Sequence, residues 1–217
     1  GGIASPGTVG NTETWDGTSW TETGDLNTVR YNSAGAGNST NSIVSAGTTP
    51  GSSYTAHTEE FSASVPIGSW ATSADMNNAN FGMGGDGAVT TAIASGGANS
   101  PSSLTSKCET FNGTSWTEQS AMNTRKYFGE NSGTSTAGLA FGGEAADLNT
   151  GREAISGSGT QTAGIAVAGT TPGGNSGTVE TFNGSSWTET TDLNTARANI
   201  GTVGATNTAI LSFGGNV

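Results

Sequence analysis

Asp25-Leu26-Asn27-Thr28-Val29-Arg30 is the first of five copies of one phrase in this sequence. The other copies are residues 75–80, 121–125, 147–152 and 192–197. The Leu or Met that anchors each copy follows the previous anchor by 50, 46, 26 and 45 positions, for Leu26, Met76, Met122, Leu148 and Leu193. Repetition at this period is typical of an array in which one small structural unit is stacked or arranged radially. The sequence therefore predicts a repeat architecture.

A pair of aromatic residues separated by a turn signal recurs with the phrase. Three copies, at residues 13–20, 109–116 and 180–187, have Asp-Gly or Asn-Gly in the turn. These dipeptides favour a two-residue type I′ turn, so each copy predicts a β-hairpin whose second strand carries a Trp. The fourth copy, residues 59–70, has an insertion at 62–68 and predicts a hairpin with a longer loop.

Short apolar runs that end in Gly make up the rest of each repeat. They are residues 43–47, 92–97, 138–143, 164–169 and 210–215. Continuous apolarity over about five residues is typical of a strand covered on both faces. Each run pairs with a preceding stretch of small residues, which gives a unit of two inner strands and two outer strands. No stretch has helical periodicity, so the predicted fold is all-β.

The order of these signals resembles the kelch repeat of β-propellers. The resemblance rests on the pairs Gly96-Gly97, Gly142-Gly143 and Gly214-Gly215, on four Trp residues and on four Arg residues, and it covers nearly the whole chain. Phrases such as Asn-Gly-Thr-Ser-Trp-Thr-Glu are similar to kelch-like arrays of marine phage virion proteins. Some kelch proteins are copper oxidases, but one His, one Cys and three Tyr are too few for that copper site, so we expect no metal and no cofactor.

The count of units predicts a single domain, residues 1–217, that forms a five-bladed propeller. Five inner pairs are present but only four aromatic hairpins. The first hairpin, at about residues 11–23, is expected to pair with the last inner strands, at about 198–215, and so to close the ring and remove two sheet edges. The blade at about residues 126–143 is expected to contain two strands only.

The outer edge of this reduced blade is a candidate interaction edge. It comprises Ala137, Gly138, Leu139, Ala140 and Phe141. Two interpretations are compatible with the sequence. Either the blade has lost a hairpin and packs between its neighbours, or a strand from another subunit or partner pairs with the edge by β-augmentation.

Composition excludes several functional classes. A net charge of −11 with six cationic residues argues against nucleic-acid binding. No apolar span approaches 18 residues, so we expect no membrane insertion. A single Cys excludes an internal disulfide, and the low charge with many hydroxyl side chains suits an extracellular or virion surface.

The repeated Arg and Trp residues each allow two interpretations. Arg30, Arg125, Arg152 and Arg197 either form a ring that binds an anion or make repeated structural bonds to carbonyls and to acids such as Asp25, Asp147 and Asp192. We favour the structural interpretation because Asn80 interrupts the ring. The four Trp residues, which are Trp20, Trp70, Trp116 and Trp187, are expected to pack between blades rather than to stack on sugars.

Isolated reactive residues give no catalytic set. His57 is expected on the surface and Cys108 inside a strand, and neither has the partners that nucleophilic or metal chemistry needs. Asn38, Asn112 and Asn183 match the N-glycosylation pattern, although turn chemistry explains two of them.

The sequence thus predicts a non-catalytic structural or recognition module of an extracellular or virion assembly, such as a tail fibre, decoration protein or filament subunit. Its expected partners are further copies of itself or other virion or fibre proteins. The alternative is a carbohydrate-binding propeller that recognises surface glycans through the loops at residues 50–55 and 99–103.

Overall fold

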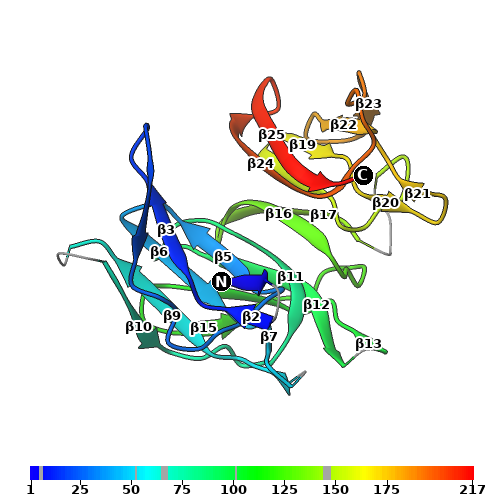
Figure 1. The fold of residues 1–217 in the computed structure, drawn as a ribbon. Coiled ribbons are helices and arrows are strands. Elements are labelled where there is room, and N and C mark those ends of the chain that lie inside the picture. The colour runs from blue at the N-terminus through cyan, green and yellow to red at the C-terminus, as the bar shows by residue number, and fades with distance from the viewer. Residues whose placement is uncertain (5–6, 52, 65–67, 101, 144–147) are drawn as a thin grey trace.

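The computed structural model describes residues 1–4, 7–51, 53–64, 68–100, 102–143 and 148–217. These residues form 25 short strands and no helix (Figure 1). The all-β prediction is confirmed. Thirty-six Gly residues and many Ser, Thr and Asn residues explain the result, because Gly and these short polar side chains disfavour helix interiors.

Three large antiparallel sheets each combine two inner and two outer strands in the predicted order. The first contains β5 (Ala34–Gly37), β6 (Asn41–Ser45), β9 (Thr58–Ser62) and β10 (Ser69–Ser73). The second contains β11 (Phe81–Asp86), β12 (Ile93–Ser100), β14 (Cys108–Phe111) and β15 (Trp116–Glu118), with β13 (Ser103–Leu104) also paired to β12. The third contains β18 (Ser156–Thr160), β19 (Ala163–Val167), β22 (Val179–Phe182) and β23 (Trp187–Glu189).

The aromatic hairpins form, but their tips differ from the predicted two-residue turns. Phe111 is opposite Trp116 and Phe182 is opposite Trp187, so four residues connect the strands. In the turn at Asn112, the side-chain Oδ1 accepts hydrogen bonds from the backbone N–H groups of Thr114 and Ser115, both at 2.9 Å. These bonds satisfy backbone N–H groups of the loop, so the Asn side chain closes the hairpin without a type I′ turn. The prediction identified the correct residues but the wrong turn type.

The other strands form two-stranded sheets. They are β1 (Gly2–Ala4) with β2 (Gly7–Val9), β3 (Thr12–Trp15) with β4 (Trp20–Thr23), β7 (Thr48–Thr49) with β8 (Ser53–Tyr54), β16 (Gly129–Thr134) with β17 (Ala137–Gly142), β20 (Thr170–Thr171) with β21 (Gly174–Asn175), and β24 (Ala198–Thr206) with β25 (Ala209–Asn216). The unit at residues 126–143 is therefore reduced to the β16–β17 pair within the described residues, as the sequence predicts.

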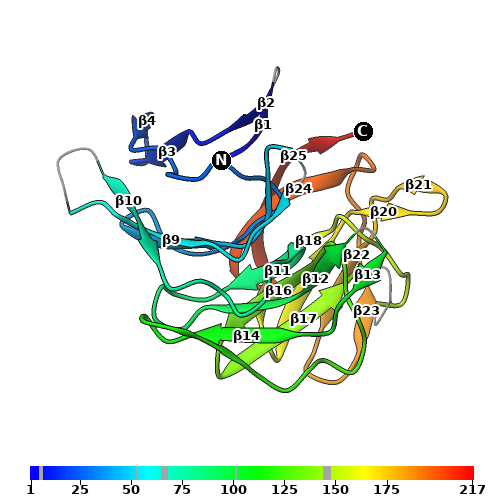
Figure 2. The ribbon, with the colours of Figure 1, turned by 90° about the horizontal axis from the view of Figure 1, so that it is seen from below.

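The predicted pairing of the two ends of the chain is absent. The β3–β4 hairpin and the β24–β25 pair belong to separate sheets, and the described residues contain no ladder between them. Figures 1 and 2 show the two hairpins apart in both views. Each hairpin is instead bonded to the neighbouring sheet: Trp70 Nε1 in β10 donates to Thr12 Oγ1 in β3 at 2.9 Å, and Asn199 N donates to Ala154 O at 3.0 Å. The expectation of a ring closed in this way is wrong for this structure.

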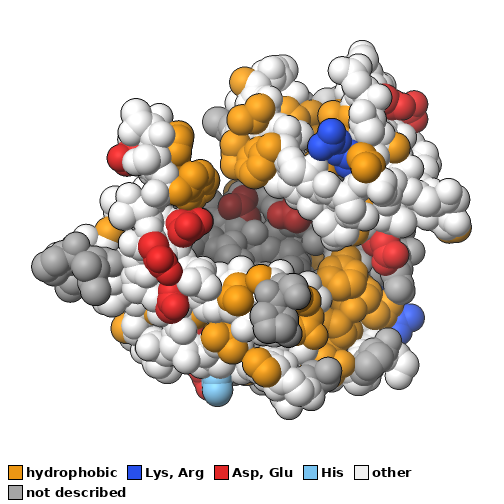
Figure 3. Space-filling view, viewed as in Figure 1, with side chains coloured by type: hydrophobic (Ala, Val, Ile, Leu, Met, Phe, Trp, Pro, Cys, Tyr) orange, Lys and Arg blue, Asp and Glu red, His pale blue; other side chains and the backbone are white. Residues whose placement is uncertain are grey.

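The innermost strands of successive sheets lie next to one another in the order β5, β11, β16, β18 and β24. A chain of backbone hydrogen bonds connects equivalent residues of these sheets. Gly82 N donates to Asn32 O, Phe128 N to Gly82 O, Ala154 N to Phe128 O and Asn199 N to Ala154 O, at 2.9 to 3.2 Å. All five residues have positive φ, between 51° and 62°. Four equivalent bonds therefore connect five residues with the same left-handed backbone conformation, which is strained in the four that are not Gly. Figure 3 shows a hollow in the middle of the molecule.

Apolar side chains pack between adjacent sheets in small clusters. Ile43, Met83, Phe111 and Trp116 belong to one cluster, and Phe141, Leu148 and Ile155 to another. The inner strands approach closely because they are rich in Gly and Ala. A Cβ atom on Gly85 would be 2.8 Å from Cβ of Ala34 in the neighbouring sheet, so a larger residue would separate the two strands.

Candidate functional site

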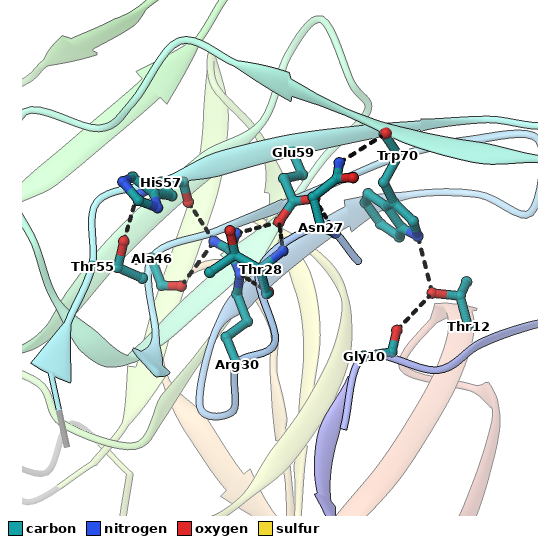
Figure 4. A network of polar contacts seen from close by, with 10 residues as sticks. All are labelled: Gly10, Thr12, Asn27, Thr28, Arg30, Ala46, Thr55, His57, Glu59 and Trp70. Carbon is teal, nitrogen blue, oxygen red and sulfur yellow. Dashed lines mark hydrogen bonds and ion pairs between the residues drawn. The ribbon is translucent and has the colours of Figure 1, made fainter. Parts of the chain in front are cut away.

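A buried glutamate in the third strand of a sheet binds the connector that enters the same sheet (Figure 4). Glu59 in β9 accepts hydrogen bonds from the backbone N–H groups of Asn27 at 2.7 Å and Thr28 at 3.0 Å. Its Oε1 also lies 2.5 Å from Nη2 of Arg30. The Asn27 side chain donates to the carbonyl oxygen of Trp70 at 2.9 Å. The Asn, Arg and Glu residues thus fasten this connector to its sheet.

The same arrangement recurs in the third large sheet. Glu180 accepts from Asn149 N at 2.7 Å and pairs with Arg152 Nη1 at 2.7 Å, and the Arg152 and Glu180 side chains are fully buried. In the second sheet Asn80 replaces the Arg, and Glu109 accepts instead from Asn77 N at 2.8 Å and from the Asn78 side chain at 3.0 Å. A buried charge is tolerated when it is paired and hydrogen-bonded, and these carboxylates satisfy that condition.

These contacts support the structural interpretation of Arg30 and Arg152 and correct the choice of acids. The partners are Glu59 and Glu180, whereas Asp25 and Asp192 make no ion pair to the described residues. The third predicted acid, Asp147, lies outside the described residues. Carbonyl oxygens also accept from the two Arg residues: Arg30 Nη1 donates to His57 O at 2.5 Å, and Arg152 Nε donates to Ala168 O at 2.9 Å. Arg152 Nη2 is buried and has no hydrogen-bond partner among the described residues. Anion binding by the four Arg residues stays a prediction.

The other two Arg residues have different surroundings. Arg197 donates to the carbonyl oxygen of Gly214 at 2.8 Å and has no acidic partner among the residues described. Arg125 is exposed, and the adjacent Lys126 takes the buried repeat position. The carbonyl oxygen of Lys126 accepts from Gly97 N as that of Arg152 accepts from Gly143 N. The repeated sequence phrase did not indicate that Lys126, one residue after Arg125, occupies the buried position of Arg30 and Arg152.

The candidate interaction edge forms the outer side of β17. Ala137, Gly138, Leu139, Ala140 and Phe141 pair with β16 on one side only, within the described part of the chain. Phe141 is fully buried against Trp187, whereas Ala137 is exposed. A groove of about 510 Å³ runs beside this edge and is lined by Ile93, Cys108, Met122, Leu139, Ala140 and others. The groove occupies the position at which other repeats have an aromatic hairpin.

Three of the four repeated Trp residues contact the preceding sheet, as predicted. Trp116 Nε1 donates to Thr58 Oγ1 at 3.0 Å, and Trp70 Nε1 donates to Thr12 Oγ1 at 2.9 Å. Trp187 packs against Phe141 with ring centroids 5.2 Å apart. Trp20 differs because 65% of its surface is exposed.

The isolated residues named from the sequence have structural surroundings. His57 is exposed, and its backbone carbonyl is used by Arg30. Burial, and after it the nearby Glu109 carboxylate, raises the pKa of the Cys108 thiol, which makes this residue a weaker nucleophile at neutral pH. Asn38, Asn112 and Asn183 are exposed and use Oδ1 to accept backbone N–H groups in turns. Glycosylation stays a prediction.

The candidate glycan-binding loops contribute to packing where they are described. The ring of Tyr54, in the loop at residues 50–55, stacks on Phe81 with centroids 4.3 Å apart. Residues 52 and 101 of the two loops lie outside the described part of the chain. Carbohydrate binding through these loops stays a prediction.

The described residues contain no group of three or more His, Cys, Asp or Glu side chains that could hold a metal ion. They also contain no helix with the length and apolarity needed to span a bilayer. Comparison of the sequence with protein-family models and with curated proteins finds no match.

Proposed function

We propose that the protein is a non-catalytic structural or recognition module built as a kelch-like β-propeller of five blades. The chain of hydrogen bonds from Asn32 to Asn199 supports a radial arrangement, because five equivalent residues are connected in sequence order and the innermost strands of successive sheets lie next to one another. The three large sheets are three blades in this proposal, β16–β17 is the reduced blade, and β24–β25 supplies the inner strands of the fifth.

The observation that carries the functional proposal is the presence of an inner strand with an unpaired edge. Among the described residues, β17 is an inner strand without the outer hairpin that the three large sheets possess. Unpaired strand edges are templates for pairing with another chain, and proteins that do not use them usually cover or shorten them. An unpaired edge beside a preformed groove therefore favours a protein whose role is assembly.

The repeated charged residues support a non-catalytic role. Glu59, Glu109 and Glu180 are fully buried and engaged by connector residues, so these carboxylates are not positioned for a substrate. A net charge of −11 also disfavours a nucleic-acid partner. We propose an extracellular or virion location, in a tail fibre, a decoration layer or a filament.

Immunogold electron microscopy of the native source tests this proposal. Antibodies raised against the purified chain should label virions, fibres or filaments in the extracellular fraction. Preimmune serum is the control. Label confined to soluble intracellular material would overturn the proposal, whatever the purified chain does in solution.

A further inference from the structure

The reduced β16–β17 unit is followed by too little sequence to form an outer hairpin of its own. In the three large sheets, 23 to 28 residues separate the glycine at the end of the second inner strand, which is Gly47, Gly97 or Gly169, from the next anchoring Leu or Met. Only four residues separate Gly143 from Leu148. Two strands and a turn cannot be built from four residues, so the unpaired edge of β17 arises in the middle of the chain.

The connector at residues 121–126, which enters this reduced unit, is held at both ends like the connectors of the large sheets. Met122 N donates to Ser106 O at 2.8 Å. The carbonyl oxygen of Lys126 accepts from Gly97 N at 2.7 Å. Equivalent bonds of 2.9 and 2.8 Å hold the two ends of the connector of the second large sheet. The residues between these ends therefore occupy the positions that bind a glutamate in the large sheets.

The middle of this connector presents hydrogen-bond donors that have no acceptor among the described residues. They are the backbone N–H groups of Asn123 and Thr124 and the side-chain amide of Asn123. The Asn residues at the same repeat position donate their backbone N–H to Glu59, Glu109 and Glu180, and their side-chain amides to the carbonyl oxygens of Trp70, Trp116 and Trp187. In the second large sheet such donors bind the buried Glu109 without an Arg, so they suffice for a carboxylate.

Backbone angles give the register of a strand that would pair with β17. Gly142 and Gly143 have φ of 71° and 84°, which match the 74° and 83° of the glycine pair in β12. This match makes Ala140 the equivalent of Ala94, which is opposite Glu109 in the second large sheet. A glutamate on a strand added to β17 would therefore lie opposite Ala140, beside the connector donors.

The groove beside β17 matches a site that an aromatic pair fills in the second large sheet. The groove of about 510 Å³ is lined by Ile93, Met122, Gly138 and Ala140, among others. The residues at the same repeat positions one unit earlier are Ile43, Met76, Ala92 and Ala94, and they form one buried cluster with Phe111 and Trp116. The groove therefore offers apolar surface of the kind that packs against a Phe and a Trp, next to the donors that bind a carboxylate.

We propose that β17 and its groove bind an extended segment of another protein that carries a Glu and, two residues later, an aromatic residue. The Glu lies opposite Ala140 and accepts hydrogen bonds from the N–H groups of Asn123 and Thr124. The aromatic residue lies opposite Gly138 and packs against Ile93. Backbone hydrogen bonds to the unpaired edge accompany both contacts, as in other cases of β-strand addition. This inference rests on the proposed function and names the chemistry of the partner.

A separate protein fits this site because the aromatic hairpins of this chain are held elsewhere within the described residues. The β9–β10, β14–β15 and β22–β23 hairpins each pair with an inner strand of their own sheet. The β3–β4 hairpin is bonded to β10 through Trp70 and Thr12. A segment from another protein can add to β17 and leave all of these contacts intact.

A peptide with the sequence of residues 178–190 tests the proposal, because it contains Glu180, Phe182 and Trp187 in the required spacing. Fluorescence anisotropy of the labelled peptide, titrated with the whole chain, should show saturable binding. The peptide variant Glu180→Gln should bind about tenfold to a hundredfold more weakly, because it cannot make the charged hydrogen bonds. The peptide variant Phe182→Ser should lose at least about tenfold, because it lacks the apolar ring.

Two substitutions at one repeat position form a reciprocal control in the chain. The Asn149 side chain has a partner within the chain, the carbonyl oxygen of Trp187 at 2.9 Å, whereas the Asn123 side chain has none among the described residues. Asn123→Ala should weaken peptide binding by about twofold to tenfold and leave the melting temperature unchanged. Asn149→Ala should lower the melting temperature and leave peptide binding unchanged. Circular dichroism during heating measures the melting temperatures.

The variant Ala140→Glu tests the edge itself, because it places a carboxylate in the groove and should abolish binding of the unchanged peptide. Absence of saturable binding of that peptide to the wild-type chain overturns the proposal. So does equal affinity for the Glu180→Gln peptide, and so does binding that Ala140→Glu leaves unchanged. Self-association of the wild-type chain that Ala140→Glu abolishes would assign the edge to a second copy and also overturns it. Peptide affinity does not depend on where the protein occurs in its source, so the proposed function is tested separately.

Discussion

Arg152 Nη1 lies 2.7 Å from Glu180 Oε1, and both side chains are fully buried. The pair joins the connector at residues 148–152 to β22 of the sheet that this connector enters. The carboxylate also accepts two backbone N–H groups, from Asn149 and Thr150. The repeated Arg and Glu residues are therefore part of the framework, and their conservation between repeats of this chain follows from their buried contacts.

Loss of one member of this pair should destabilise the protein strongly. Glu180→Gln leaves the Arg152 guanidinium buried without a counter-charge, and we expect a loss of about 3–5 kcal/mol in the free energy of unfolding. Glu109→Gln is the matched control because Asn80 replaces the Arg there, and the expected loss is only about 1–2 kcal/mol. Urea denaturation of both variants measures the difference, and equal losses would contradict the role assigned to the ion pair.

Glu130 should make stability depend on pH. Burial, and after it the nearby Asp86 carboxylate, raises the pKa of Glu130 from 4.5 to about 8. The folded state therefore keeps a proton between pH 4.5 and 8 that the unfolded state releases, so the contribution of this residue to stability falls as pH rises through that window. Asp86 stays bonded to backbone N–H groups of Gly87 and Gly133, both at 2.7 Å.

The variant Glu130→Gln isolates this effect. It should have nearly the same stability as the wild type near pH 4, and it should exceed the wild type at pH 8 by at most a few kcal/mol, since one pKa unit corresponds to about 1.4 kcal/mol. Melting temperatures of both proteins across this range measure the difference. A constant difference from pH 4 to pH 8 would show that Glu130 has an ordinary pKa.

The repeat unit could be predicted from the sequence, whereas contacts between distant residues could not. The apolar runs and aromatic pairs correctly predicted the inner strands and hairpins, because both signals are local. The sequence did not indicate that Arg30 pairs with Glu59 rather than with Asp25, since that choice depends on how the connector folds over β9. The recurrence of Glu two residues before each aromatic was the available signal.

The contacts of the two ends of the chain could not be predicted from the sequence either. The sequence predicted that the β3–β4 hairpin and the β24–β25 pair would join in one blade, but they belong to separate sheets, and counting repeats cannot determine whether two such elements meet. That outcome depends on long-range packing, including the bonds that hold Thr12 and Asn199 on different sheets.

Gly133 should be irreplaceable in the reduced β16–β17 sheet. Its φ is 109°, and a Cβ atom there would overlap the carbonyl oxygen of Ala137. We expect Gly133→Ala to cost about 2–4 kcal/mol, from backbone strain of about 1–2 kcal/mol and steric overlap of similar size. Gly17 is the control, because its φ is 102° but no atom lies within 4 Å of the added Cβ. Gly17→Ala should cost only the strain, and thermal unfolding distinguishes the two.

Trp116 and Trp20 occupy equivalent repeat positions but should respond differently to replacement by Phe. Trp116 is 7% exposed and donates to the fully buried hydroxyl of Thr58. Trp116→Phe leaves that hydroxyl without its donor and should cost about 1–3 kcal/mol. Trp20 is 65% exposed, so Trp20→Phe should change the stability of the isolated chain by less than about 0.5 kcal/mol. Urea denaturation at low protein concentration measures both, and a large cost at Trp20 under these conditions would show that this hairpin is packed within the single chain.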